Sequence, residues 1–151
     1  MISPMILISQ QNNISYSDHI MLIEAERKVQ DNMSFTYYYN RAWGFVKNDG
    51  EASYDAIVYF YRAIEIAPDN MLGGIYSDLG NCFRGGLKNY IIAEEYYSKA
   101  ILNNFQKSFV YYNRAICRYM NGNLESSRID LMTSKRKGWS NDSFNLMKLL
   151  E

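Results

Sequence analysis

A sequence of five residues that occurs twice is the feature that most limits how this chain can fold. Tyr-Tyr-Asn-Arg-Ala stands both at 38–42 and at 111–115. A second pattern, in which a large apolar residue lies between two small ones at fixed spacing, occurs three times. Its members are Ala56, Phe60 and Ala63; Ala93, Tyr97 and Ala100; and Ser127, Leu131 and Ser134. From Ala25 through Ala63 and Ala100 to Ser134 the steps are 38, 37 and 34 residues, so we interpret the chain as a series of repeats.

The spacing within each repeat is typical of two packed helices. Ala42, Gly80 and Ala115 are small, which lets helix axes approach to roughly 8–10 Å. A single hairpin cannot bury its apolar face, whereas a stack of hairpins can. Pro68 begins a Pro-Asp-Asn sequence that we predict to end a helix, and residues 121–123, Asn-Gly-Asn, predict a tight turn. The predicted fold class is therefore all-α, built from antiparallel helix hairpins.

This pattern resembles the tetratricopeptide repeat (TPR) family. In that motif an aromatic residue, Leu-Gly and a second aromatic mark the first helix, and Ala, Phe, Ala and Pro mark the second. The matching residues are Tyr76, Leu79, Gly80 and Phe83 for the first helix, and Ala56, Phe60, Ala63 and Pro68 for the second. The turns at 48–53 and 84–89 are longer than usual, and in this they are similar to the Sel1-like repeats. The resemblance implies a right-handed α-solenoid, a TPR-like superhelix.

The repeats predict five segments within a single domain. Residues 1–34 form an N-terminal partial repeat, in which 17–30 is helical. Three full repeats follow at 35–70, 71–107 and 108–141. Residues 142–151 form a C-terminal capping helix, which we expect over 144–150 with Asn141 and Asp142 as its N-terminal cap.

Nothing in the sequence predicts catalysis or a bound cofactor. His19 is the single histidine, and the two cysteines, Cys82 and Cys117, lack the spacing of a metal site or a disulfide framework. We therefore predict that the protein is not an enzyme and binds no cofactor or metal. The first ten residues are apolar, but they lack a basic start and contain Pro4, which fits neither a signal peptide nor a membrane span of roughly 20 residues. We expect a cytoplasmic location without membrane binding.

The resemblance also implies a function, because in this family the inner faces of the first helices line a concave groove that holds a peptide. Carried over to this chain, that geometry selects three side chains from each full repeat. The predicted groove residues are Tyr39, Trp43, Val46, Ser77, Asn81, Arg84, Tyr112, Ile116 and Tyr119. Tyrosine and tryptophan suit binding because they offer large, rigid contact areas. We predict a protein–protein interaction module, an adaptor or scaffold, that receives a peptide or helix. The alternative is that several of these aromatics only pack the core.

One known binding mode of the family does not fit. Some members hold the C-terminal carboxylates of a partner with lysine, arginine and asparagine side chains. Tyr39 and Trp43 occupy the positions at which those members carry a lysine and an asparagine. We therefore predict that this protein does not bind an acidic C-terminal peptide such as one ending in Glu-Val-Asp.

Charge is distributed unevenly along the chain, although sixteen basic and sixteen acidic residues cancel. Residues 1–75 hold five basic and nine acidic side chains, and residues 76–151 hold eleven and seven. The residues of the predicted basic end are Arg114, Arg118, Arg128, Lys135, Arg136 and Lys137. In a stack of repeats, position in the sequence is position along the axis, so the basic end could meet an acidic partner or the acidic end of a second copy. The alternative is a solvated helix end, which the helix dipole favours.

RNA binding is the second candidate function. Exposed tyrosines would stack on bases beside the C-terminal arginines. The zero net charge and the acidic N-terminal half argue against a nucleic-acid partner.

Overall fold

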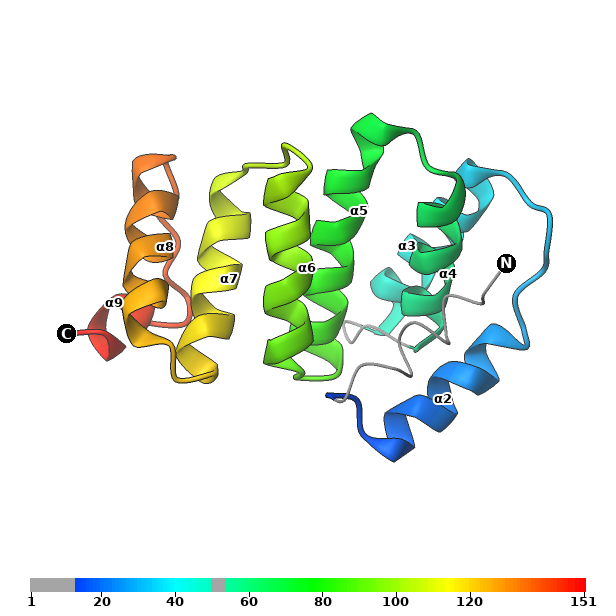
Figure 1. Ribbon diagram of the computed structural model, residues 1–151, viewed down its shortest axis with the longest axis horizontal. Coiled ribbons are helices and arrows are strands. Elements are labelled where there is room, and N and C mark those ends of the chain that lie inside the picture. The colour runs from blue at the N-terminus through cyan, green and yellow to red at the C-terminus, as the bar shows by residue number, and fades with distance from the viewer. Residues whose placement is uncertain (1–12, 50–53) are drawn as a thin grey trace.

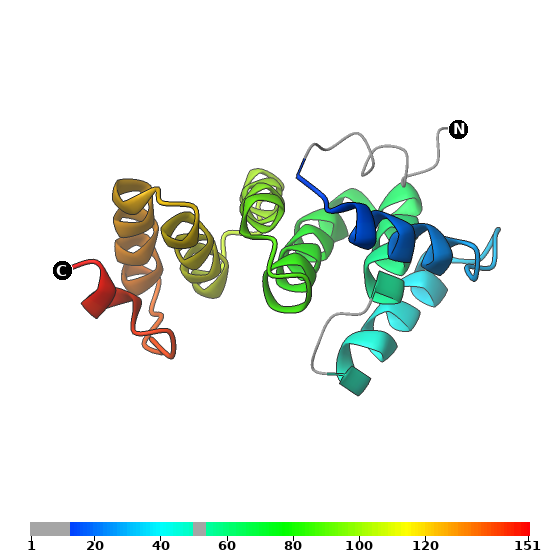
Figure 2. The ribbon, with the colours of Figure 1, turned by 90° about the horizontal axis from the view of Figure 1, so that it is seen from below.

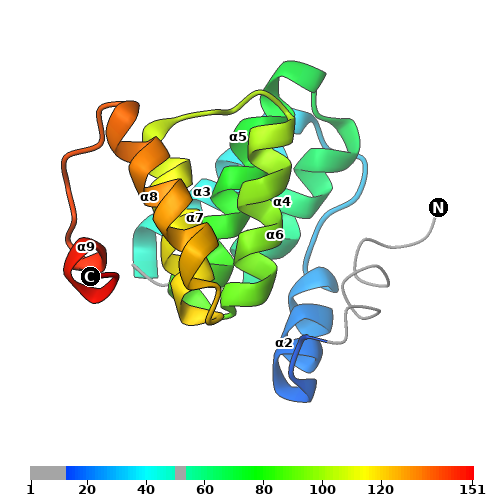
Figure 3. The same cartoon turned by 60° about the vertical axis from the view of Figure 1, so that its left-hand side comes forward.

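The computed structural model describes residues 13–49 and 54–151, and these form helices joined by turns and loops, with no strand among them. The helices after residue 68 follow one another in chain order toward one end of the molecule, and those of residues 16–66 lie together at the other end (Figure 1). Helices α2 (Tyr16–Glu26) and α9 (Leu146–Leu149) lie at opposite sides of the helices between them (Figure 3). The predicted all-α fold class is therefore confirmed for the described residues.

Three pairs of consecutive helices make the most extensive contacts. The pairs are α3 (Phe35–Asp49) with α4 (Tyr54–Ile66), α5 (Asp69–Asn81) with α6 (Tyr90–Leu102), and α7 (Ser108–Met120) with α8 (Leu124–Arg136). Each pair begins within two residues of a predicted repeat boundary. Between pairs, α6 packs on α7 more extensively than α4 packs on α5. Seen from below, the pairs are arranged along the long axis of the molecule (Figure 2).

The small residues of the repeat pattern lie where helices approach closely. Ala42, Ala63, Ala100 and Ala115 are all fully buried. At Gly80 in α5, an added Cβ would lie 2.7 Å from a ring atom of Tyr97 in α6. Any side chain at this position would therefore push the two helices apart. The close approach that the spacing predicts is confirmed here.

The turns differ in part from the prediction. Pro68 is the N-cap of α5, so the residues that follow it already belong to that helix and the Pro-Asp-Asn turn is shorter than expected. Gly122 has a φ of 81° in the tight turn between α7 and α8, a conformation that glycine adopts without strain. The long turn predicted at 84–89 overlaps a π-helical turn, η1 (Cys82–Gly86), that continues α5. Of the long turn predicted at 48–53, residues 50–53 lie outside the described part of the chain.

Both terminal helices are shorter than predicted. Helix α2 ends at Glu26 rather than near residue 30. Helix α9 is a single turn because Asn145, just before it, has a left-handed φ of 56° that interrupts the helix expected from residue 144. Asp142 nevertheless caps this turn, since its carboxylate accepts hydrogen bonds from the backbone N–H groups of Leu146 and Met147 at 2.8 and 3.0 Å. The prediction for residues 1–12 lies outside the described residues.

Candidate functional site

A groove runs between α3, α5 and the beginning of α7. It consists of two adjoining hollows of about 480 and 230 Å³ that share Trp43, Asp78 and Asn81. Tyr39 and Trp43 come from α3, Gly74 and Asp78 from α5, Phe105 from the loop before α7, and Phe109 from α7 itself. Val46 and Arg84 line the smaller hollow. We call these two hollows the central groove.

Aromatic side chains form the α3 side of the central groove. The Tyr39 and Trp43 rings meet edge to face, with their centroids 6.5 Å apart. Both also pack edge to face on the fully buried Phe60 of α4, at 6.0 and 6.1 Å. Because Phe60 supports both rings, they present fixed surfaces to the groove, and little side-chain entropy remains to be lost when a ligand binds. On the other side, the Phe105 and Phe109 rings form an edge-to-face pair at 6.0 Å.

Asp78 supplies the acidic group of the central groove. Its carboxylate accepts one hydrogen bond, from the Tyr39 hydroxyl at 3.4 Å. Burial raises the pKa of Asp78 to about 7, and the Tyr39 hydrogen bond counteracts this rise only in part. No arginine or lysine among the described side chains forms an ion pair with it. At neutral pH this acid is therefore close to its midpoint of titration, and its charge lacks a basic partner within the described chain.

Asn81 connects the floor of the groove to helices α6 and α7 through hydrogen bonds. Its side-chain carbonyl accepts hydrogen bonds from the Tyr97 hydroxyl of α6 at 2.8 Å and from the Asn113 amide of α7 at 3.1 Å. Arg84 donates from Nε to the same Tyr97 hydroxyl at 3.3 Å. The floor therefore belongs to a network that spans three helices, and the position of Asn81 depends on how those helices pack.

Five of the nine predicted groove residues line the central groove, and three others are buried. The residues that line it are Tyr39, Trp43, Val46, Asn81 and Arg84. The expectation of an exposed groove residue is wrong for Ser77, Tyr112 and Ile116, which are at most 3% exposed. On α5 the groove is lined by Gly74, Asp78 and Asn81. Asp78 therefore takes the place in the groove that the sequence assigned to its neighbour Ser77. The i, i+4, i+7 spacing of that face is the signal that could have identified Asp78.

The chain's own C-terminal segment covers the predicted groove face of the third repeat. The Tyr112 hydroxyl donates to the Asp142 carboxylate at 2.8 Å and accepts from the Phe144 backbone N–H at 3.1 Å. The Trp139 ring packs against Tyr112 at 5.4 Å, and Phe144 packs against Tyr119 at 6.2 Å. Tyr119 therefore contacts this segment, and among the described residues of α7 only Phe109 lines the central groove.

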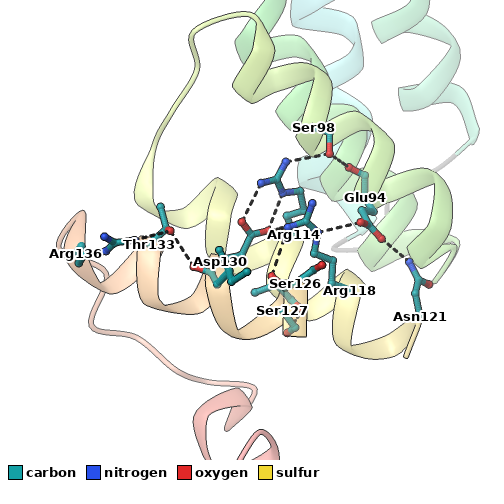
Figure 4. Close-up of polar contacts among 12 residues, drawn as sticks. Glu94, Ser98, Arg114, Arg118, Asn121, Ser126, Ser127, Asp130, Thr133 and Arg136 are labelled. Carbon is teal, nitrogen blue, oxygen red and sulfur yellow. Dashed lines mark hydrogen bonds and ion pairs between the residues drawn. The ribbon is translucent and has the colours of Figure 1, made fainter. Parts of the chain in front are cut away.

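The predicted basic end is partly neutralised by ion pairs within the molecule. Arg114 binds the Asp130 carboxylate through two hydrogen bonds of 2.7 and 2.9 Å. Arg118 donates to the same carboxylate and to Glu94, both at 2.9 Å. Figure 4 shows both arginines of α7 directed at acids from the neighbouring helices α6 and α8. Arg114 and Arg118 are therefore structural ion-pair partners rather than free positive charges, and this part of the prediction is wrong.

The other four basic residues of that end lie at the surface. Arg128, Lys135, Arg136 and Lys137 are all exposed. Arg128 donates to the Leu150 carbonyl and Lys135 contacts the Met147 sulfur, so two of them also hold the C-terminal segment. Lys137 lies over the Tyr111 ring, with Nζ 5.5 Å from its centroid. The charge available to a partner is therefore smaller and more local than the sequence predicted.

Both cysteines of the protein are free and buried. Burial raises the pKa of the Cys82 thiol well above its ordinary value, and the nearby Asp78 adds to this. Burial likewise raises the pKa of Cys117 to about 12, so both thiols are neutral at physiological pH. In the described ranges, no three His, Cys, Asp or Glu side chains lie where they could hold a metal ion. None of the described helices has the length and apolar content that crossing a bilayer requires.

No protein-family model matches the sequence, and no curated protein matches it.

Proposed function

We propose that this protein is a protein–protein interaction module that binds an extended peptide or a helix in the central groove. The observation that carries the proposal is the groove itself, in which supported aromatic rings face a polar floor across hollows of about 480 and 230 Å³. Pockets of this size with apolar walls and a few fixed polar groups are typical binding sites. In the groove, Tyr39 and Trp43 are the anchors that would contribute most of the binding energy.

We further propose an arrangement of the helix pairs, a role and a cellular location. The helix pairs form a right-handed TPR-like stack, in which the central groove lies on the concave side of the first helices. The module acts as an adaptor or scaffold, without catalysis of its own. It works in the cytoplasm, where its two cysteines stay reduced; both are free and buried.

The structure lends less support to the alternatives. For RNA binding, two of the C-terminal arginines are held by Asp130 and Glu94. Among the described tyrosines only Tyr16 is exposed, so few rings are free to stack on bases. End-to-end self-association would depend on the remaining surface charges at α8, two of which also hold the C-terminal segment.

The experiment is a selection from a displayed library of random linear peptides, followed by affinity measurement with the synthetic winners. Two glycine variants form a matched pair. At Gly74 an added Cβ makes only an ordinary contact of 3.9 Å with Phe105, so Gly74→Leu is expected to fold and to fill the groove. At Gly44, on α3 but outside the central groove, an added Cβ meets nothing within 4 Å.

We expect selected peptides to bind the wild type and Gly44→Leu alike and to lose at least about tenfold in affinity for Gly74→Leu, since a few anchor contacts dominate binding. Thermal unfolding of both variants checks that they are folded. Equal binding to Gly74→Leu and loss of binding to Gly44→Leu would instead place the site at the hollow of about 530 Å³ beside Tyr37 and Arg41. That result would overturn the proposal.

A further inference from the structure

We propose that the central groove recognises one basic side chain of the partner, a lysine or an arginine, whose charged group meets the Asp78 carboxylate beside the rings of Tyr39 and Trp43. This inference rests on the proposed function, because it names the side-chain chemistry that the same groove selects. It commits the occupant to a peptide segment with a single basic residue at a fixed position.

The charge of Asp78 has no basic partner among the described residues. Acids withdrawn from water are normally paired, because an uncompensated buried charge is strongly unfavourable. Asp130 follows this rule, since two arginines bind its carboxylate. Glu94 follows it too, with Arg118 at 2.9 Å and the Asn121 amide at 2.9 Å. Within the described residues Asp78 has only the Tyr39 hydroxyl, at 3.4 Å.

The unmatched carboxylate of Asp78 faces the open central groove rather than other side chains. Asp78 lines both hollows of the central groove, so a group from outside can reach it. A cation that enters would supply the missing countercharge in a partly desolvated setting, where such pairs are stronger than at an open surface. The raised pKa of Asp78 agrees with this picture, because it reflects a carboxyl without a compensating positive charge.

The aromatic walls of the central groove also favour a cation. Tyr39 and Trp43 line the larger hollow together with Asp78, and the Tyr39 hydroxyl donates a hydrogen bond to the Asp78 carboxylate. Electron-rich aromatic faces attract lysine and arginine cations, tryptophan most strongly, and also pack on the aliphatic part of those side chains. An acidic or neutral polar side chain gains no cation–π attraction from such walls. A carboxylate together with aromatic walls therefore favours a basic residue over other polar ones.

Arg84 limits the number of basic residues that the central groove accepts. Arg84 lines the smaller hollow together with Asp78, and its Nε is engaged with the Tyr97 hydroxyl. A positive charge fixed there repels a second basic residue entering that hollow. We therefore expect recognition of an isolated basic residue rather than a basic run.

The test uses the peptides selected by the full-length protein. Each winning peptide is synthesised again with its basic residue replaced by methionine, which keeps the length of the side chain but not the charge. Both forms are titrated against the wild type and against Asp78→Asn, in which the amide keeps an acceptor for the Tyr39 hydroxyl. Trp43→Leu tests the aromatic wall in the same way, and unfolding curves report whether each variant is folded.

We expect the methionine peptide to bind the wild type about tenfold more weakly than the basic peptide, and Asp78→Asn to reduce this ratio to less than about threefold. Exchange of lysine for arginine should change affinity little. Selected peptides that are blocked by Gly74→Leu but carry no fixed basic residue would overturn this inference and leave the proposed function intact. An undiminished ratio in Asp78→Asn would also overturn it. If selection yields no peptide that Gly74→Leu blocks, the proposed function itself fails.

Discussion

Replacing Asp78 by asparagine is expected to stabilise the free protein at neutral and alkaline pH. The folded state raises the pKa of this carboxyl from 3.8 to about 7 because burial disfavours its charge. Between these two values the folded chain holds a proton that the unfolded chain has released. The free energy of unfolding therefore falls as the pH rises from about 4 to about 7, and it levels off above that. Asparagine has no such charge and removes this loss.

The size of the effect follows from the same shift. Moving a carboxyl pKa from 3.8 to about 7 corresponds to about 4 kcal/mol at most, at about 1.4 kcal/mol for each pH unit. Asp78 lines an open groove, so water screens part of this penalty, and we expect about 2 kcal/mol. For a chain of this length that gain corresponds to a rise of roughly 4–8 °C in Tm.

The assay is urea unfolding of the wild type and Asp78→Asn at a series of pH values from about 4 to about 8. Their difference is informative because contributions from the other titrating groups cancel. Asp69→Asn, in the exposed first turn of the same helix, is the control. This substitution removes an acid that interacts favourably with the helix dipole, so it should slightly destabilise the protein. Parallel pH profiles for the wild type and Asp78→Asn, with no gain in stability at about pH 8, would refute the reasoning.

Four further predictions concern packing, ion pairing, the C-terminal segment and ligand choice. Gly80→Ala should lower the free energy of unfolding by about 1–3 kcal/mol, because its Cβ would overlap a facing tyrosine ring, whereas Gly74→Ala should raise it by about 0.5–1 kcal/mol; calorimetry of both variants checks this. Asp130→Asn should destabilise the protein by about 3–5 kcal/mol, because two half-buried arginines lose their carboxylate, and a denaturation midpoint close to that of the wild type would contradict this. Tyr112→Phe should speed hydrogen exchange in residues 142–150 and leave α5 unaffected, since it removes only the hydrogen bonds to Asp142 and the Phe144 N–H. A peptide ending in Glu-Val-Asp should not bind, and micromolar affinity in calorimetry that disappears when its C-terminus is amidated would show the opposite.

The repeat spacing allowed most of the helix pairs to be predicted. The repeated spacing of small and large residues predicted the close helix approach at Gly80 and the apolar faces that carry Phe60 and Tyr97. These positions could be predicted because they depend only on which face of a helix is apolar. Pro68 and Gly122 marked turns through properties of their own backbones. Structural features that depend on only one or two helical turns could therefore be predicted from the sequence.

The candidate site was predicted less well, for two physical reasons. Neighbouring positions on a helix differ by about 100° in direction, so choosing Ser77 instead of Asp78 exchanged a buried side chain for one that lines the groove. The ion pairs of Arg114 and Arg118 and the cover over Tyr112 depend on tertiary contacts between distant residues. Net charge by segment does not contain that information.

The uneven packing between helix pairs has a consequence for how the molecule would respond to a ligand. Arg118 and Asn121 join the second and third pairs through Glu94, whereas α4 and α5 contact each other less extensively than α6 and α7 do. In a linear array, the weakest junction sets where partial opening begins. The central groove spans that junction, with aromatic walls on one side and Asp78 on the other. A bound peptide that contacts both sides of the groove would therefore stabilise this junction against local opening.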